Sequence, residues 1–538
     1  MLILQRDFVL LRDFCDYYEI LRFTLMGESP SREEIAMSPR TKHANRQATR
    51  KPPASGRKPT GSISARDVSM AAEELQNFHR QFHSLFPRRE HRMWSLLYLC
   101  GQLSNLERKT IEPIVLSLVG ADPNAIRGMQ QFIGQGGWDS TVLVHKMQEL
   151  VSSWLGEEEG VVIVDGSGFP KQGKHSVGVA RQYCGALGKI ANCQEGVFLV
   201  YASGRGYVFV DERLYVPEEW FSDESRERRI DCKMPRTLTF QTEPELGLEM
   251  IKALVERNVL PFRWVTCDEN YGKNTAFLDG IAALGKWYLA EVPADTRVWL
   301  RTPAVEPPGP GLLGRPRLHP RVKRTAPPPM ELRALMAQLS PTTWQQRKIQ
   351  EGSKGPLKVE IACVRVTPVR NQLPGTRCWA IFRRSLGPQP ESKYYLCNAP
   401  TDSPEAKLAH LTGRRWPIET ALEEGKGEVG LDHFETRTWP GWHHHMVHSF
   451  LAHLFLMRLR LLFQKKVQHL RLPRLGSWQR VRSRTRQPVF QISLPSCTTA
   501  NLVTMLLIVL TGNVLRSGRQ RKLPNAKSRS NYRNLVVI

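Results

Sequence analysis

Two short apolar segments, each running into an aspartate, most constrain the fold of this chain. The segment GVVIVDGSGF reaches Asp165, and FRWVTCDENYG reaches Asp268, 103 residues further on. Short runs of β-branched and apolar residues followed by turn-forming residues predict buried strands. Sites in α/β sheets form where strands end, because the loops open there. We therefore expect Asp165 and Asp268 to stand at two strand ends, although a lone aspartate in that place is more often a turn former or helix cap.

The segments between and after these two strands predict an α/β fold. VGVARQYCGAL and EGVFLVYASGRGYVFVDERLYV add strands, the second split at the Gly204–Gly206 turn, and PELGLEMIKALVERNVL is an amphipathic helix. Strands and helices in this order predict an α/β domain, which we place at residues 156–301 and 400–462. The Pro-rich stretch 302–330 is a predicted linker, and LKVEIACVRVTPV, RCWAIFRRS and SKYYLCNAP complete a β-rich insertion that ends at residue 399.

The chain before the first strand divides into two parts. Residues 28–66 are rich in Ser, Pro, Lys and Arg, which predicts disorder, and residues 1–27 are either a short helix or a non-native extension of the reading frame, so residues 1–66 together form a disordered segment or extension. Residues 67–155 place apolar side chains at three- and four-residue spacing and are predicted to be helical. This helical N-terminal domain is either a DNA-end-binding domain or a structural cap, because helix content alone does not imply DNA recognition.

The charge of the chain indicates a polyanionic partner. The formal net charge is +25 and the isoelectric point is about 9.9, which favours nucleic acid over a membrane surface or an acidic substrate. The excess is uneven: no Asp or Glu follows Glu435, and the 18 Lys and Arg from Arg437 onward supply 18 of the 25 charges. The basic tail, residues 463–538, is therefore either a phosphate-binding segment or a solvated tail from a shifted reading frame.

Cysteines and apolar runs indicate a cytoplasmic protein with no membrane segment. The ten cysteines form no CxxC pair, which is typical of reduced thiols. Charges at Arg6, Asp7, Arg12 and Asp13 interrupt the first apolar run, so it does not match a signal peptide. The stretch Leu502–Leu510 is too short to span a bilayer comfortably.

A third acidic element lies in RRWPIETALEEGKGEVG, residues 414–430. As a helix, this segment carries an apolar stripe, and Glu419 borders that stripe while Glu423 and Lys426 share a neighbouring face. One interpretation is that Glu419 reaches into a site while its helix packs on the sheet. The other is an exposed helix with a Glu423–Lys426 ion pair, which spacing alone favours.

Phosphodiester chemistry explains why three carboxylates would be needed together. Hydrolysis requires an activated water and a stabilised leaving oxygen, and two Mg²⁺ ions about 3.5–4 Å apart supply both. Mg²⁺ prefers hard oxygen ligands and keeps part of its water shell. Asp165, Asp268 and Glu419 would thus hold the metal ions and also be the catalytic residues.

The three motifs together resemble the DDE transposases of bacterial insertion sequences. VVIVDGSGFPKQGKHSVGVARQYCGALGKIANCQEGVFLVY, WVTCDENYG and RRWPIETALEEGKGEVGLDHFETRTWPGWHHHM follow in the family's order, over about residues 67–460. More narrowly, the chain is similar to the cut-and-paste branch with a Y-R-E-K signature. Arg415, Glu419 and Lys426 match its spacing, whereas Thr412 stands where the branch has its Tyr.

The resemblance implies an RNase H-like catalytic domain that binds two Mg²⁺ (or Mn²⁺) ions. It also implies a substrate of double-stranded DNA with terminal inverted repeats, a target DNA, and a homodimer on paired ends in the bacterial cytoplasm and nucleoid. DNA cleavage at the element ends and strand transfer would be its reaction. Two other possibilities remain: a catalytically decayed, transposase-derived DNA-binding protein, and another RNase H-like nuclease.

Four basic residues are candidate DNA contacts. The resemblance assigns phosphate contacts to Arg415 and Lys426, which flank Glu419, and a charge-assisted hydrogen bond gives the physical reason. Lys174 and Arg181 follow Asp165 in a Gly-rich stretch and are candidates for the DNA path. Each of the latter two, taken singly, is more commonly a solvated surface residue.

Overall fold

A computed structural model describes residues 65–309, 317–352 and 355–463 of the chain. The predicted extension up to residue 64, and the basic tail from residue 464 with its apolar run Leu502–Leu510, lie outside the described residues. From Glu73 onward the described residues belong to one compact unit, to which the arrangement below refers.

Within the described residues, five α-helices precede the first strand, as the periodicity of residues 67–155 predicts. Asp122 and Asp139 begin two of them, each accepting a hydrogen bond from a backbone N–H two residues on, at 2.8 Å. The helices are α2 (Ala65–Arg80), α3 (Arg89–Gln102), α4 (Ile111–Leu118), α5 (Pro123–Gln135) and α6 (Ser140–Leu155). That they form a domain binding DNA ends stays a prediction.

The remainder is built on one 13-stranded mixed sheet, which agrees with the α/β prediction. Within it, β5 runs parallel to both β1 and β6, whereas β3 is antiparallel to β1, and β2 and β4 are antiparallel to β3. The apolar character of β5, buried at all four residues, fits a central parallel strand. These strands are β1 (Val161–Pro170), β2 (Ala180–Cys184), β3 (Lys189–Ala202), β4 (Tyr207–Tyr215), β5 (Trp264–Cys267) and β6 (Trp287–Val292).

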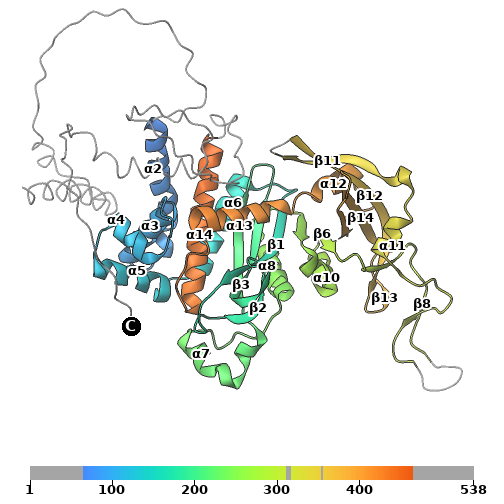
Figure 1. The fold of residues 1–538 in the computed structure, drawn as a ribbon, viewed down its shortest axis with the longest axis horizontal. Coiled ribbons are helices and arrows are strands. Elements are labelled where there is room, and N and C mark those ends of the chain that lie inside the picture. The colour runs from blue at the N-terminus through green and yellow to red at the C-terminus, as the bar shows by residue number, and fades with distance from the viewer. Residues whose placement is uncertain (1–64, 310–316, 353–354, 464–538) are drawn as a thin grey trace, which may run out of the picture. The chain divides into compact units, whose positions relative to one another are not determined.

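The predicted β-rich insertion continues this same sheet. β15 pairs antiparallel with β6, with Tyr394 opposite Val292, and β14, β12 and β7 follow outward. Figure 1 shows the strands of the insertion beyond β6. They are β7 (Arg297–Trp299), β10 (Met330–Glu331), β11 (Gln345–Gly352), β12 (Gly355–Arg370), β13 (Leu373–Pro374), β14 (Cys378–Ser385) and β15 (Ser392–Cys397). The Pro-rich linker carries a small separate ladder, β8 (Val305–Glu306) with β9 (Arg321–Val322).

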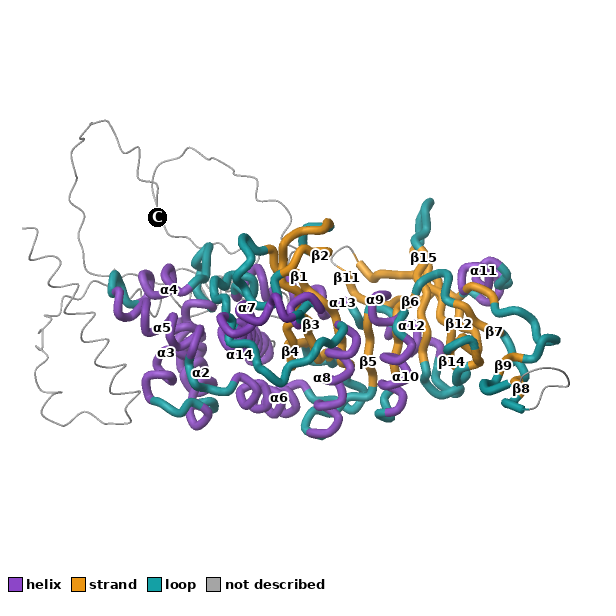
Figure 2. The backbone as a smooth tube through the Cα atoms, turned by 90° about the horizontal axis from the view of Figure 1, so that it is seen from below, coloured by secondary structure: helices purple, strands orange, loops and turns teal. Residues whose placement is uncertain are grey.

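Helices that lie between the strands in sequence pack on this sheet, and Figure 2 shows α8 and α10 beside its strands. Thr242 and Glu245 form a capping box at the start of α8 (Glu243–Arg257), and α10 (Thr275–Ala283) packs against α8 and β6. α13 (Trp416–Val429) contacts β1, β3 and β4, and it ends at Gly430, whose φ of 71° favours glycine. Shorter helices are α7 (Arg226–Asp231), α9 (Glu269–Gly272), α11 (Leu332–Ala337) and α12 (Glu405–Leu411).

The long helix α14 (Trp439–Phe463) forms the core between the sheet and the preceding helices. It contacts β4 on one side and α3, α5 and α6 on the other. His444 is 3% exposed, stacks on Trp138 and bonds the carbonyl of Ile133 at 2.8 Å, so it acts structurally. Among the described residues, α14 alone is long and apolar enough to span a bilayer, and 78% of its most apolar window is buried inside the protein, as in a core helix.

Candidate active site

Asp165 lies within β1 rather than at its end, which corrects the sequence prediction. The parallel ladder between β1 and β5 stops at Val164 and Cys267, whereas β1 continues to Pro170 beside β3. Gly166 and Gly168 look like turn formers in isolation, but their antiparallel partner extends the strand. Asp165 is therefore the first β1 residue beyond the ladder with β5, at the point where Asp268 follows Cys267.

Asp268 is the N-cap residue of the short helix α9, so it is a helix cap and also a candidate site residue at the end of β5. Its Oδ1 accepts hydrogen bonds from the backbone N–H groups of Asn270 at 3.0 Å and Tyr271 at 3.2 Å. These contacts fix the carboxylate beside the end of β5. The helix-cap interpretation is thus correct, and it places the same side chain next to Asp165.

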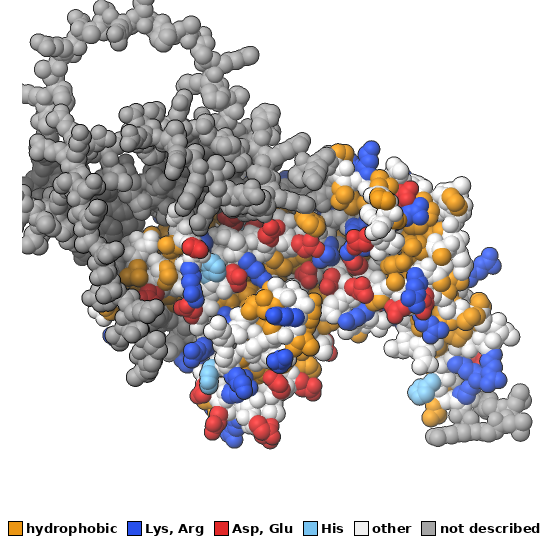
Figure 3. All heavy atoms as spheres, viewed as in Figure 1, with side chains coloured by type: hydrophobic (Ala, Val, Ile, Leu, Met, Phe, Trp, Pro, Cys, Tyr) orange, Lys and Arg blue, Asp and Glu red, His pale blue; other side chains and the backbone are white. Residues whose placement is uncertain are grey.

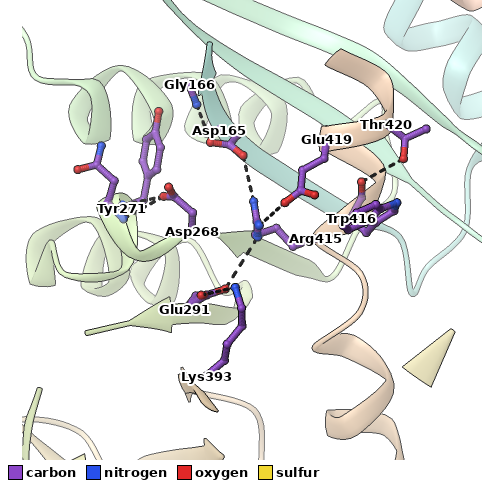
Figure 4. Close-up of polar contacts among 11 residues, drawn as sticks. Asp165, Gly166, Asp268, Tyr271, Glu291, Lys393, Arg415, Trp416, Glu419 and Thr420 are labelled. Carbon is purple, nitrogen blue, oxygen red and sulfur yellow. Dashed lines mark hydrogen bonds and ion pairs between the residues drawn. The ribbon is translucent and has the colours of Figure 1, made fainter. Parts of the chain in front are cut away.

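The start of α13 brings Glu419 and Arg415 to these aspartates (Figure 4). Arg415 Nη1 lies 3.1 Å from Asp165 Oδ2, Nη2 donates to Glu419 Oε1, and Nε lies 4.0 Å from Glu291 Oε2. The charge of Asp268 also acts on Arg415 and on Asp165. Carboxylates from β1, β6 and α13 therefore meet around one guanidinium, with the aspartate after β5 beside them.

Crowded negative charge shifts the titration of both aspartates. Burial raises the pKa of Asp165 to about 7, and the charge of Asp268 adds to this, while Arg415 opposes it. Burial likewise raises the pKa of Asp268, whereas the hydrogen bonds from backbone N–H groups and the charge of Arg415 lower it by less. The arrangement thus holds more negative charge than one arginine neutralises, which favours the binding of further cations.

The donor atoms suit Mg²⁺, but their present arrangement is closed around Arg415. Carboxylate oxygens are the ligands that Mg²⁺ prefers. Nevertheless, no three His, Cys, Asp or Glu side chains in the described part of the chain stand together so as to hold a metal ion. Metal binding would require Asp165, Asp268 and Glu419 to close in on the space that the guanidinium takes.

Glu291 is a site residue that the sequence reasoning missed. It lies on β6 with its side chain 14% exposed, and its Oε1 accepts from Lys393 Nζ at 2.8 Å. A charged residue inside the apolar strand WYLAEV was the available signal, because such a residue is rarely buried without a partner. In Figure 3, acidic side chains gather around this part of the sheet with basic ones among them.

A second acidic pair lies beside Gly166. A Cβ at Gly166 would stand 3.1 Å from Glu195 Oε1 and 3.4 Å from Glu243 Oε2, so the glycine leaves room for both carboxylates. Burial raises the pKa of Glu195 to about 8, and the charges of Glu243 and Asp165 add to this against Lys426. Sequence inspection missed Glu195, because it is one alternating residue in a long strand.

Replacing Glu195 with glutamine is expected to stabilise the protein at alkaline pH. Since the folded-state pKa lies above the ordinary value of 4.5, stability falls as pH rises from about 4.5 to 8, and the full penalty persists above that. Glu195→Gln removes this penalty, which a shift of that size puts on the order of 5 kcal/mol at pH 9, and gains nothing near pH 4. Thermal unfolding between pH 4 and pH 9 measures the gain in stability, and Glu112→Gln is the control because Glu112 is exposed. An equal gain at pH 4 and pH 9 would contradict the explanation.

The remaining predicted residues divide between the site and the surface. Lys426 donates to the carbonyl of Gly168 at 3.3 Å, on the strand that carries Asp165. Lys174 and Arg181 are exposed, in the β1–β2 loop and on β2, and their DNA contacts stay predictions. Thr412 is 3% exposed and donates to the carbonyl of Ala409, so this position does not face a ligand.

Comparison with protein families shows to which family this chain belongs. The family model of the DDE superfamily endonucleases matches residues 81–356, about half of the chain, including Asp165 and Asp268. This chain belongs to the DDE superfamily endonucleases. The matched region stops before α13, so Glu419 and Arg415 lie outside it.

Comparison with curated proteins and solved structures adds one distant relative. This DDE endonuclease is 24% identical over 380 residues to the probable transposase for insertion sequence element IS701 of Microchaete diplosiphon, covering 70% of this chain and 86% of the relative. Family and relative together support a transposase function. The NurA nuclease of Sulfolobus solfataricus matches 53% of this chain and 86% of its own with 9% identity, but a TM-score of 0.23 defines no shared fold.

Proposed function

We propose that this protein is a metal-dependent transposase in which Asp165, Asp268 and Glu419 are the catalytic, metal-binding residues. The observation that carries the proposal is the convergence of these carboxylates, from β1, the end of β5 and α13, around Arg415. Its reaction would be DNA cleavage at the ends of a transposable element, followed by attack of the freed 3′-hydroxyl on a second strand.

The strand order supports an RNase H-like catalytic core. The five strands read β4-β3-β1-β5-β6 across the sheet, with β3 antiparallel and β5 and β6 parallel to β1. Asp165 lies on β1, and Asp268 directly follows β5, which is the fourth of these five strands in chain order. Glu419 comes from α13 and pairs with Arg415.

Each residue of the site has a physical task in this reaction. Two divalent ions, when bound, would polarise the scissile phosphate and generate hydroxide from water at neutral pH. Asp165, Asp268 and Glu419 would hold them, while Lys426 and Arg415 would fix the phosphates of the DNA strand through charge-assisted hydrogen bonds. Burial of the site strengthens these interactions by excluding water.

The finer assignments also belong to this proposal. The spacing of Arg415, Glu419 and Lys426 supports the Y-R-E-K branch, although Thr412 departs from it. We infer a substrate of terminal inverted repeats, a dimer on paired ends, and a place in the bacterial cytoplasm near the nucleoid. The net charge of +25 supports association with DNA.

The proposal is tested by comparing two glutamates one helical turn apart. Glu419→Gln is expected to reduce Mg²⁺- or Mn²⁺-dependent nicking of a supercoiled plasmid bearing the element ends by on the order of 10³-fold, because it removes a metal ligand. Glu423 is exposed, so Glu423→Gln should nick as the wild type does. Equal activity of wild type and Glu419→Gln would refute the assignment, and loss in Glu423→Gln alone would transfer the role.

The alternative of a decayed DNA-binding protein predicts a different outcome of the same assay. Such a protein would bind the element ends but would not nick them with either metal. Asp165 and Glu419 both pair with Arg415, and Asp268 lies beside Asp165, an arrangement that favours the active enzyme. Binding to the inverted repeats, measured alongside nicking, also separates a transposase from another RNase H-like nuclease.

A further inference from the structure

Arg415 is held mainly by two of the three proposed metal ligands. Its Nη1 pairs with Asp165 Oδ2 at 3.1 Å and its Nη2 with Glu419 Oε1, whereas Nε lies 4.0 Å from Glu291 Oε2. Lys393 already neutralises Glu291 at 2.8 Å, which leaves Glu291 a weaker hold on the arginine. The guanidinium is thus fixed chiefly by oxygens that a metal ion would also need.

The backbone of Arg415 is anchored, but its side chain reaches solvent. Arg415 stands at the N-terminal boundary of α13, immediately before Trp416, so its Cα moves only with that helix. Its side chain is 22% exposed, compared with 18% for Asp165. Rotation of the side chain can therefore carry the guanidinium from the carboxylates toward a ligand at the surface without moving the helix.

Pairing with carboxylates and pairing with DNA compete for the same group. The planar fork of a guanidinium matches carboxylate and phosphate equally well, and it forms bidentate pairs with either. Likewise, a divalent cation and the guanidinium compete for Asp165 Oδ2 and Glu419 Oε1, because both are positive and both need the same space. Binding of a phosphate by Arg415 would therefore free the carboxylates for metal.

We infer that Arg415 is an electrostatic latch, which fills the cation position between Asp165 and Glu419 in the DNA-free protein and leaves it when DNA phosphate is bound. This inference rests on the proposed function of the same carboxylates. Its consequence is that metal and DNA bind cooperatively, since each favours the state in which Arg415 has left the carboxylates. Cleavage chemistry would then be assembled only on DNA.

The latch is tested by measuring the affinity of the full chain for Mn²⁺ in the absence of DNA. Electron paramagnetic resonance detects the free Mn²⁺ ion and so gives the amount that is bound. Arg415→Gln is expected to bind Mn²⁺ about 5- to 150-fold more tightly than the wild type, the range of typical coupling energies. Arg414→Gln is the matched control, because Arg414 bonds His410 and the carbonyl of Ser203 instead of these carboxylates. Arg415→Lys keeps the positive charge and should stay near the wild-type affinity.

Thermal unfolding gives a second readout that does not depend on activity. Without metal, Arg415→Gln should melt below the wild type, because it leaves Asp165 and Glu419 unpaired. Added Mn²⁺ should raise the melting temperature of Arg415→Gln back toward the wild-type value, while it should change the melting temperature of the DNA-free wild type little. Equal or weaker Mn²⁺ binding by a folded Arg415→Gln would overturn the latch, since Arg415 would then organise the carboxylates for metal.

The result separates the latch from the proposed function. Adding Asp165→Asn to Arg415→Gln should abolish the gain in Mn²⁺ affinity, which ties that gain to the carboxylate. If Glu419→Gln loses nicking but Arg415→Gln leaves Mn²⁺ affinity unchanged, the transposase proposal stands and the latch fails. If Glu419→Gln nicks normally, the proposed function fails, whatever the Mn²⁺ measurement shows.

Discussion

Asp165→Asn and Asp268→Asn are each expected to lower metal-dependent DNA nicking by on the order of 10³-fold or more. The amide keeps the size of each side chain but removes the charge that a divalent cation requires. Both residues lie where β1 and β5 separate, so neither replacement disturbs the ladder between these strands. Conversion of supercoiled to open-circular plasmid in Mg²⁺ and in Mn²⁺ measures the loss.

A neighbouring carboxylate provides the control for this pair. Glu269 follows Asp268 directly and is exposed, so Glu269→Gln removes one charge from the same helix but not from the site. It should nick at the wild-type rate. Binding of the element ends should survive all three replacements, because none removes a basic contact. Wild-type nicking by either asparagine variant would exclude that aspartate as a metal ligand.

Among the replacements proposed for this protein, Glu424→Gln is expected to lower the free energy of unfolding most, by about 3 kcal/mol. Glu424 lies on the inner side of α13, where it pairs with Arg460 at 3.0 Å and His453 at 3.2 Å and accepts from Tyr207 Oη at 2.9 Å. Removing its charge leaves Arg460 of α14, which is partly buried, without this ion pair. Urea denaturation at pH 7 measures the difference.

The pH dependence of this loss identifies its cause. Burial raises the pKa of Glu424, but hydrogen bonds and charges from His453 and Arg460 outweigh it and hold the pKa at about 2. A depressed folded-state pKa means that the stabilisation is complete above about pH 4.5 and is lost as pH falls toward 2. Glu423→Gln, an exposed neighbour on the same helix, should change stability little at any pH. A constant difference between Glu424→Gln and wild type down to pH 2 would exclude the ionic explanation.

Local patterns were sufficient to predict most elements of the candidate site. Apolar runs gave β1 and β5, and the 3.6-residue pattern gave α13 with its buried stripe of Ile418, Ala421 and Val429. Spacing alone did not distinguish Glu419 from Glu423, because both lie on one side of that helix. The fold distinguishes the two glutamates, because α13 directs Glu419 toward Arg415 and Asp165 and leaves Glu423 exposed.

Other features depended on partners far away in sequence. The extension of β1 past Asp165 comes from its ladder with β3, which overrides the turn tendency of Gly166 and Gly168. The continuation of the sheet into the insertion depends on the pairing of β15 with β6. Neither partner can be recognised from residues adjacent in the chain.

The sequence by itself predicted the three proposed carboxylates and the class of chemistry they fit, and it located the strands and the helix that carry them. Such information is local, because side-chain periodicity and turn residues report burial within a few residues. Only the tertiary structure placed Arg415 against Asp165, 250 residues away, and brought Glu291 and Glu195 beside them. Which charges meet depends on sheet order and register, and these are settled by packing across the whole fold.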